Sequence, residues 1–216
     1  MRVVSISRDG SDRAREELER CVAGAGVVVF PADTVYGLGC EPQSRPAVER
    51  IDALKGRDEG KPSAVMFFAP LAMRGILSTL GPRTREALGA LLPGPVTTVV
   101  PNPQLRYPLA CGSDPERLGL RLIKGPLAGA RCALFQTSAN RSGEPAPSRF
   151  EDIDPDILAG VELAIDGGKL GGAPSTVVDL TSLEEEGRWS VLREGALRSR
   201  QLESRLREAL GDFATP

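Results

Sequence analysis

The chain has 216 residues, 41% of them hydrophobic, and a formal net charge of −2, which together favour one domain over residues 1–216 with a substantial core. The small net charge argues against a generally basic nucleic-acid-binding protein. The absence of histidine excludes Ser-His-Asp and Cys-His catalysis and nearly all zinc sites, so any chemistry must use other side chains or groups of the substrate.

The first predicted helix covers residues 11–25, because Ala14, Leu18 and Val22 recur on one face and Gly24 and Gly26 follow. A buried strand is expected at 27–30, entering a loop at Pro31.

Ser44 is a suitable N-cap for a second helix, with Val48, Ile51 and Leu54 pointing inward. Further strands are predicted at 64–68, 96–100, 118–123, 133–136, 161–165, 176–180 and 190–192, and further helices at 71–80, 83–92 and 197–210. Strands interspersed with helices predict an α/β fold around one sheet. Irregular spacing favours a mixed sheet, and a doubly wound parallel sheet is the alternative.

The beginning of the chain turns polar too early for a signal peptide, and no apolar run is long enough to span a bilayer. The four cysteines, Cys21, Cys40, Cys111 and Cys132, show no close pairing and are expected to be reduced, buried thiols. We therefore expect a cytoplasmic protein with no membrane partner.

The phosphate-binding motifs of nucleotide enzymes are incomplete here. There is no GxGxxG, and the nearest approach to a Walker A motif, from Gly56 to Ser63, is one residue short and has Pro62 between its lysine and serine. Lys55 and Lys61 flank Arg57 in this stretch, although the chain has only four lysines against 23 arginines. Either these cations face a polyphosphate or they form a solvated charged turn.

Two other segments could hold a ligand. The QTSANRSG segment from Gln136 to Gly143 follows an apolar strand and offers neutral donors at the strand end, where α/β proteins commonly bind ligands, although such residues also form ordinary turns. The glycine-rich segment from Asp166 to Pro174 is either a plain connection or a lid.

Taken together, these segments resemble the YrdC-like family, which includes the threonylcarbamoyl-AMP synthases. The matching segments cover nearly the whole chain in order: PADTVYGLG at 31–39, KGR at 55–57 with KP at 61–62, LPGPVT at 92–97, LGLR at 118–121, SAN at 138–140 with SGEP at 142–145, STVVD at 175–179 and LREG at 192–195.

The resemblance implies a large twisted mixed sheet with flanking helices and a concave basic face, in a short form without a second domain. It implies synthesis of threonylcarbamoyl-AMP from ATP, L-threonine and bicarbonate, with Mg²⁺ accompanying ATP, for later use by tRNA-modification proteins. The implied catalytic residues are Lys55, Arg57, Ser138 and Asn140; ATP would contact Arg57, Lys61, Ser138 and Arg193; and threonine would contact Thr34, Arg121 and Ser175.

The sequence also departs from the family pattern. Ala32 replaces a usual threonine, Met66 a frequent histidine, and the segment 122–125 replaces a frequent Pro-His sequence. Two alternatives to the synthase are a double-stranded-RNA or ribosome-binding protein of the same fold, and a related enzyme that handles carbamoyl phosphate or hydrolyses nucleotides. Scarce aromatic residues disfavour the stacking on bases that RNA recognition commonly uses.

Overall fold

A computed structural model of the chain describes residues 1–58 and 60–211. Its strands are β1 (Arg2–Ser5), β2 (Val28–Pro31), β3 (Tyr36–Cys40), β4 (Ala64–Phe67), β5 (Val96–Pro101), β6 (Arg117–Leu122), β7 (Ala133–Ser138), β8 (Leu163–Asp166), β9 (Thr176–Asp179) and β10 (Ser190–Arg193). Its helices are α1 (Ile6–Asp9), α2 (Ser11–Ala23), α3 (Arg45–Lys55), α4 (Arg74–Leu77), α5 (Pro82–Leu91), α6 (Pro108–Cys111), α7 (Pro155–Ala159), α8 (Leu183–Glu186) and α9 (Ser199–Leu210), with 3₁₀ turns at Pro70–Met73 and Phe150–Asp152.

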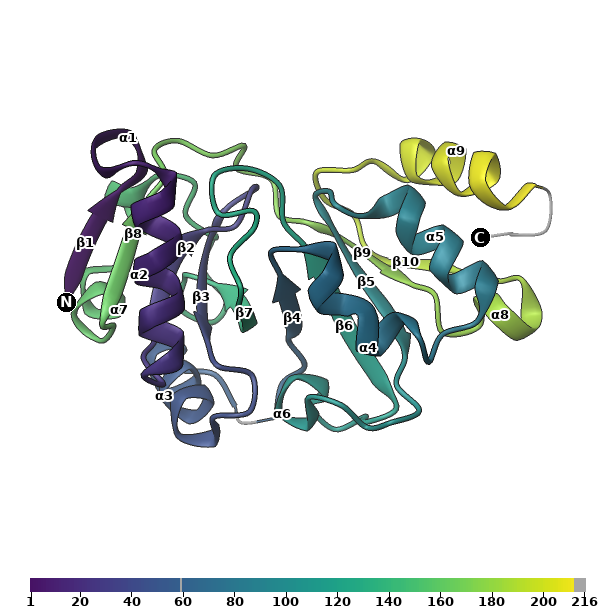
Figure 1. The fold of residues 1–216 in the computed structure, drawn as a ribbon, viewed down its shortest axis with the longest axis horizontal. Coiled ribbons are helices and arrows are strands. Elements are labelled where there is room, and N and C mark those ends of the chain that lie inside the picture. The colour runs from purple at the N-terminus through teal and green to yellow at the C-terminus, as the bar shows by residue number, and fades with distance from the viewer. Residues whose placement is uncertain (59, 212–216) are drawn as a thin grey trace.

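The described strands form one ten-stranded sheet in the order β1-β8-β2-β3-β7-β4-β6-β5-β9-β10. The sheet contains parallel pairs, such as β4 with β6 and β5 with β9, and antiparallel pairs, such as β4 with β7 and β5 with β6. The mixed sheet is therefore confirmed, and the doubly wound parallel alternative is wrong. Helices flank the sheet along its length, with α2 beside β8 and β2 and with α5 against α9 (Figure 1).

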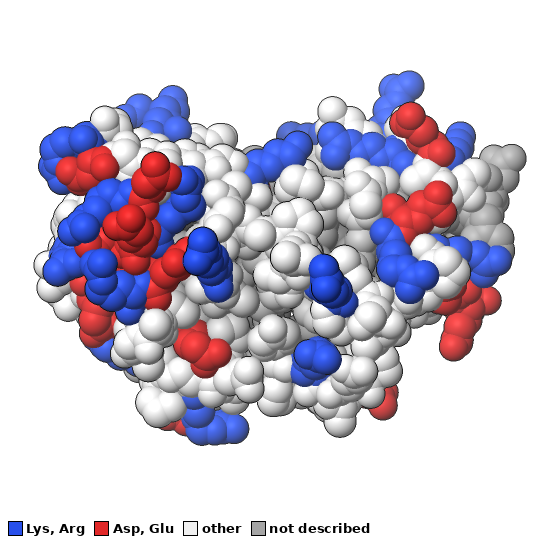
Figure 2. All heavy atoms as spheres, in the orientation of Figure 1, with Lys and Arg blue, Asp and Glu red and all other residues white. Residues whose placement is uncertain are grey.

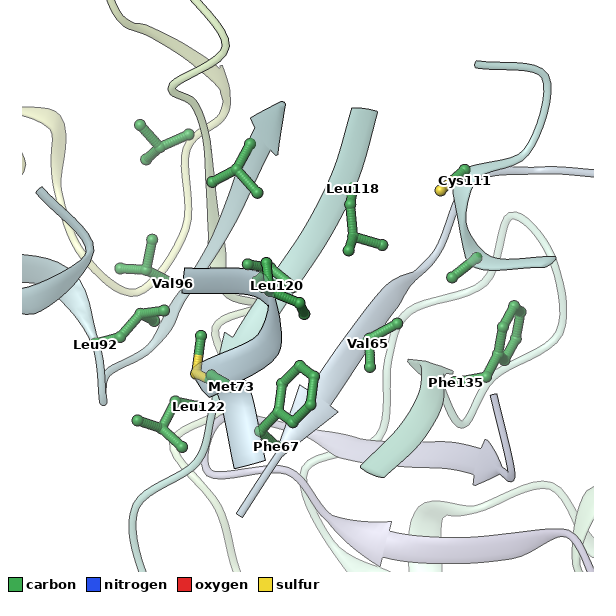
Figure 3. Close-up of a cluster of buried hydrophobic side chains, with 14 of the residues drawn as sticks. Val65, Phe67, Met73, Leu92, Val96, Cys111, Leu118, Leu120, Leu122 and Phe135 are labelled. Carbon is green, nitrogen blue, oxygen red and sulfur yellow. The ribbon is translucent and has the colours of Figure 1, made fainter. Parts of the chain in front are cut away.

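Alternation along β6 shows how the sheet divides the chain between core and site. Leu118, Leu120 and Leu122 point into the larger apolar cluster, where they meet Val65, Phe67 and Phe135 (Figure 3). The intervening residues, Arg117, Gly119 and Arg121, belong to the opposite face, because successive side chains of a strand alternate. One face of β6 therefore supplies core and the other supplies polar groups.

A second apolar cluster explains why only part of this opposite face is open. Ala14, Leu18 and Val22 of α2 pack there against Phe30 and Met66. They cover the sheet near β8 and β2, whereas the face of β6, β5 and β9 beyond them lies open to a hollow.

Strand β3 was not predicted, because Gly37 and Gly39 have low strand propensity. The structure requires both glycines: a Cβ on Gly37 would lie 3.1 Å from ring atoms of Phe30, and one on Gly39 would lie 2.9 Å from a methyl carbon of Leu134. The ring of Phe30 thus occupies the space that ordinary side chains of β3 would need.

Other boundaries also differ from expectation. The predicted helix 71–80 is a 3₁₀ turn followed by the single turn of α4, and β1 and the shortest helices were not predicted. Ser44 does precede α3, but its hydroxyl makes no capping hydrogen bond in the described part of the chain, and Leu54 is only half-buried. The four cysteines are unpaired; Cys40 and Cys111 are buried, whereas Cys21 and Cys132 are partly exposed.

Candidate active site

A hollow of about 660 Å³ lies on the open face of the sheet. Its walls come from β4, β5, β6, β7 and β9, from the start of the loop after β7 and from Arg193 of β10. The volume is in the range that drug-sized ligands occupy. Five predicted site residues line it: Arg121, Ser138, Asn140, Ser175 and Arg193. The hollow is therefore the natural place to look for substrate-binding groups.

Arg121 forms the most deeply buried charge in the hollow, with only 3% of its surface exposed. Its Nη2 donates to Asp33 Oδ1 at 2.6 Å and to the carbonyl oxygen of Ala32 at 3.1 Å, and its Nη1 donates to Gln136 Oε1 at 3.2 Å. Its Nε is buried without a partner among the described residues. Because an unpaired buried donor is costly, this N–H is suited to an oxygen of a ligand.

Asp33 supplies the counter-charge of Arg121. It stands in a left-handed conformation with φ of +58°, which aspartate tolerates better than most residues. Burial raises the pKa of Asp33 to about 6, although the Arg121 guanidinium acts in the opposite direction. Burial likewise lowers the pKa of Arg121. The pair therefore remains sensitive to any second anion that approaches Arg121.

Ser175 and Arg193 form the wall beside Arg121. The Ser175 and Thr97 hydroxyl oxygens lie 3.0 Å apart, and Arg193 Nη2 donates to the carbonyl oxygen of Ser175 at 2.9 Å. The positive charge of Arg193 contributes to lowering the pKa of Arg121, so the two guanidinium groups act on the same region. Hydroxyl groups and two cations thus meet at this end of the hollow.

The segment from Ser138 to Asn140 forms the opposite wall, and Lys55 holds it in place. Lys55 Nζ donates to the carbonyl oxygens of Ser138 at 2.5 Å and Asn140 at 2.6 Å. Asn140 Nδ2 donates to the carbonyl oxygens of Arg141 and Glu144, whereas its Oδ1 is buried without a partner in the described chain. Like Arg121 Nε, this atom points to a missing hydrogen-bonding partner.

Arg57 lies behind the same wall. Its Nε donates to Asp52 Oδ1 at 2.5 Å, and its terminal nitrogens donate to the hydroxyls of Ser63 and Thr137, which both line the hollow. Its guanidinium carbon is 5.5 Å from the centre of the Phe135 ring. In this structure Lys55 and Arg57 therefore contact protein atoms, and their contact with substrate stays a prediction.

Thr34 and Lys61 are not among the residues that line the hollow. Thr34 is buried between Asp33 and Val35, and only Val35 of these three reaches the wall. Lys61 is 49% exposed, and its Nζ lies 3.1 Å from Asp58 Oδ2. Its neighbour Pro62 lines the hollow, so Lys61 stands close to the rim.

The structure also places in the hollow residues that the sequence did not assign to a ligand individually. They are Arg117, Asp114 and Glu144, together with Gln136 at the start of the segment 136–143 that was predicted to hold a ligand. A signal for Arg117 was available, because it stands four residues before Arg121 and therefore on the same face of a strand. The other three come from loops or from pairing with Arg121, which only the folded chain reveals.

The glycine-rich segment after β8 is tied down on both sides. Leu170 N donates to the carbonyl oxygen of Ser148, and Gly172 N donates to that of Thr34, both at 2.8 Å. Tyr36 anchors its beginning, since its hydroxyl donates to the carbonyl oxygen of Gly168 at 2.8 Å. In this conformation the segment acts as a fixed connection, and Pro174 at its end contributes to the hollow.

Charge on the surface is mixed. On the face that Figure 2 shows, arginine and lysine side chains are interspersed with aspartate and glutamate, most densely near the N-terminal helices. The hollow itself carries Arg117, Arg121 and Arg193 together with Asp114 and Glu144. A concave basic face thus remains a prediction. Among the described helices, none is long and apolar enough to cross a membrane.

A twisted mixed sheet with a polar hollow on one face defines an α/β ligand-binding fold, and comparison with known proteins identifies its family. The Sua5/YciO/YrdC family model, described as "Telomere recombination", matches residues 21–195, and the chain belongs to this family.

Individual relatives agree with the family assignment. A threonylcarbamoyl-AMP synthase of Nitrosococcus oceani is 33% identical over 167 residues, which cover 74% of this chain and 89% of that protein. The structure of P. abyssi Sua5 complexed with L-threonine is 26% identical with a TM-score of 0.80 and covers 99% of this chain. This chain spans 62% of that Sua5 chain. E. coli YciO is 25% identical with a TM-score of 0.74, covering 90% of this chain and 94% of YciO.

Proposed function

We propose that this chain is a threonylcarbamoyl-AMP synthase, which forms threonylcarbamoyl-AMP and pyrophosphate from L-threonine, bicarbonate and ATP. The observation that carries the proposal is a hollow lined on two walls by residues that each keep a buried polar atom without a partner in the described part of the chain, Arg121 (Nε) and Asn140 (Oδ1). A family member with this arrangement needs a ligand that offers acceptors to one wall and donors to the other. An amino acid beside a nucleotide meets both requirements.

Threonine is assigned to the end of the hollow around Arg121. Its carboxylate would accept from Arg121 Nε, and its hydroxyl would reach the hydroxyl pair of Ser175 and Thr97. Thr34 is buried and does not line the hollow, so it would act indirectly, by holding its neighbours Asp33 and Val35 in position. P. abyssi Sua5, a relative of similar fold, has been solved complexed with L-threonine, which supports threonine as a substrate of this chain.

The proposed reaction needs no histidine. The neutral amine of threonine combines with bicarbonate, by way of carbon dioxide, to give a carbamate and water. A carbamate oxygen then attacks the α-phosphorus of ATP, and pyrophosphate leaves. Because the nucleophile comes from the substrate, the chain has to hold two anions in line and stabilise the charge that develops on the phosphate.

ATP is assigned to the wall formed by Ser138 and Asn140, with Arg193 and Lys61 as charged partners. Lys55 and Arg57 would serve by fixing this wall, because Lys55 holds two of its carbonyl oxygens and Arg57 holds two of its neighbouring hydroxyls. Removing single electrostatic donors of this kind typically costs about 10²–10³ in turnover.

Mg²⁺ is expected to enter with ATP as part of the substrate. Among the described residues, no group of three or more aspartate, glutamate, cysteine or histidine side chains could hold a metal ion. Asp114 and Glu144 are carboxylates that line the hollow, and an Mg²⁺ ion that enters with ATP would keep mainly water and phosphate ligands. Such an ion would neutralise phosphate charge.

The test is pyrophosphate release from ATP, with threonine and bicarbonate omitted in turn. We expect release only when both are present, and loss of release in Arg121→Ala but not in Arg207→Ala, an exposed arginine on α9 outside the hollow. Release that ignores threonine would instead favour a nucleotide-hydrolysing relative. Salt-dependent RNA affinity without nucleotide binding would favour the RNA-binding alternative.

Transfer of the product to tRNA-modification proteins is part of the same proposal.

A further inference from the structure

Arg117 is a charged residue of the hollow that the proposed reaction has not yet used. It begins β6 and shares the open face of that strand with Gly119 and Arg121. Four residues of strand separate it from Arg121 by about 13 Å. The two guanidinium groups therefore mark separate positions along the floor of one hollow.

Arg117 is held by a fixed partner. Its Nη2 forms an ion pair with Asp179 Oδ2, and Asp179 Oδ1 accepts from Thr181 N at 2.9 Å and from Thr181 Oγ1 at 2.7 Å. The Arg117 side chain is 40% exposed, against 17% for Asp179. Because a guanidinium has five N–H donors in a rigid fork, the Asp179 contact leaves donors available to a ligand.

The strand directions place Arg117 at the nucleotide end of the hollow. Strand β4 is parallel to β6 and antiparallel to β7, so the start of β6 lies at the same edge of the sheet as the end of β7. Ser138 ends β7, and Pro62 and Ser63, which follow Lys61, border the same edge. Ser138, the Lys61 segment and Arg117 thus share one end, whereas Arg121, with Arg193 beside it, lies towards the other.

The geometry of the proposed reaction then assigns a ligand to Arg117. In phosphoryl transfer the attacking and leaving oxygens lie in line on opposite sides of the phosphorus. If threonine is held at Arg121, the leaving pyrophosphate extends away from it, towards the edge where Arg117 stands. We propose that Arg117, oriented by Asp179, binds the β- and γ-phosphates of the nucleoside triphosphate. This inference rests on the proposed function.

Asp114 makes Arg117 more important for phosphate binding. Asp114 lines the hollow and lies three residues before Arg117, and the backbone N–H of Arg117 donates to the carbonyl oxygen of Asp114 at 3.3 Å. Without Arg117, the carboxylate of Asp114 would lie in the hollow beside the phosphates without this counter-charge, and Asp179 would lose its ion-pair partner. Arg117→Ala should therefore weaken ATP binding by about 10-fold to 100-fold, as expected for the loss of a charge-assisted hydrogen bond.

The experiment is isothermal titration of the full chain with Mg-ATP, AMP and pyrophosphate, without threonine so that no turnover occurs. We expect Arg117→Ala to weaken ATP and pyrophosphate by about 10-fold or more and AMP by less than about two-fold. Arg117→Lys, which keeps the charge but loses the fork, should fall in between. Arg207→Ala is the matched control, and thermal unfolding checks that each variant is folded.

Asp179→Asn separates a ligand contact from a structural role. If Arg117 served only to pair with Asp179, Asp179→Asn and Arg117→Ala would weaken ATP equally; we expect the Asp179 variant to lose less. Equal ATP affinity in wild type and Arg117→Ala, or equal loss of ATP and AMP, overturns this inference. Failure of the wild-type chain to bind ATP at all would overturn the proposed function itself, so the two failures are distinguishable.

Discussion

Replacing Lys55 by methionine tests the buried cation that holds the wall of the hollow. Lys55 is 5% exposed, and burial lowers its pKa from 10.5 to about 8, with the positive charge of Arg57 as the second cause. That difference corresponds to a cost of about 3 kcal/mol for the charged form in the folded state. Burial of the charged Lys55 destabilises the folded state, so stability does not explain its presence. We therefore expect the ammonium group to serve the site.

The sign of the pH effect follows from linkage. Below about pH 8 both folded and unfolded states hold the proton, and the cost is fully present. Between about pH 8 and 10.5 the unfolded state binds more protons than the folded state, so stability rises with pH. Wild type should therefore gain about 3 kcal/mol over this range relative to Lys55→Met, or roughly 6–12 °C in Tm.

The assay is thermal or urea unfolding of both proteins from pH 7 upward, compared as a difference. The difference cancels the buried thiols, such as Cys40, whose pKa burial raises to about 12 and whose effect on stability has the opposite sign. In parallel, turnover of Lys55→Met at pH 7 should fall by about 10²–10³, because the carbonyl oxygens of Ser138 and Asn140 lose their common donor. A pH-independent difference would show that Lys55 is not a buried cation with a lowered pKa, and normal turnover in the variant would show that the site does not need it.

Three further predictions concern the walls of the hollow. Arg121→Ala leaves the Asp33 carboxylate without its ion-pair partner, so it should lower the free energy of unfolding at pH 8 by about 3 kcal/mol or more. Urea unfolding measures this change, and an unchanged midpoint would show that the pair is not buried in solution. Because the pKa of Asp33 is raised to about 6, the folded state binds more protons than the unfolded state between about pH 4 and 6, and this group makes stability fall as pH rises through that range. Asp33→Asn should remove this fall in stability. An identical dependence of stability on pH in the variant would contradict the prediction. Asn140→Ala should reduce kcat/KM about 10-fold or more by steady-state kinetics, since its unpaired Oδ1 is expected to bind substrate; wild-type kinetics would place the substrate elsewhere.

Much of the fold follows from local sequence patterns. Alternating residues in the predicted strand 118–123 match the buried leucines of β6, and the helix at 11–25 matches α2 to within two residues of its end. Strand β3 was not predicted because its glycines are required by the ring of Phe30, a residue of the neighbouring strand β2, and no local pattern shows that contact. The order of strands, which brings β1 beside β8, depends on long-range pairing that no local pattern encodes.

The site was predictable in part. Residue type and position in the motifs indicated Arg121, Ser138, Asn140, Ser175 and Arg193, and all five line the hollow. Sequence could not tell whether a lysine or arginine faces a ligand or the protein's own carbonyl and carboxyl oxygens. Lys55 and Arg57 do the latter in this structure, because the turn after α3 directs them towards β7 rather than into the hollow.

The most direct test of the central claim is the identity of the product. The wild-type chain is incubated with ATP, L-threonine and carbon-13 bicarbonate. The products are separated by chromatography, and their masses are measured by mass spectrometry. We expect an adenylate that contains threonine and one labelled carbon, formed in step with pyrophosphate. Consumption of ATP without any threonine-containing adenylate, or an adenylate without the label, would contradict the proposed function.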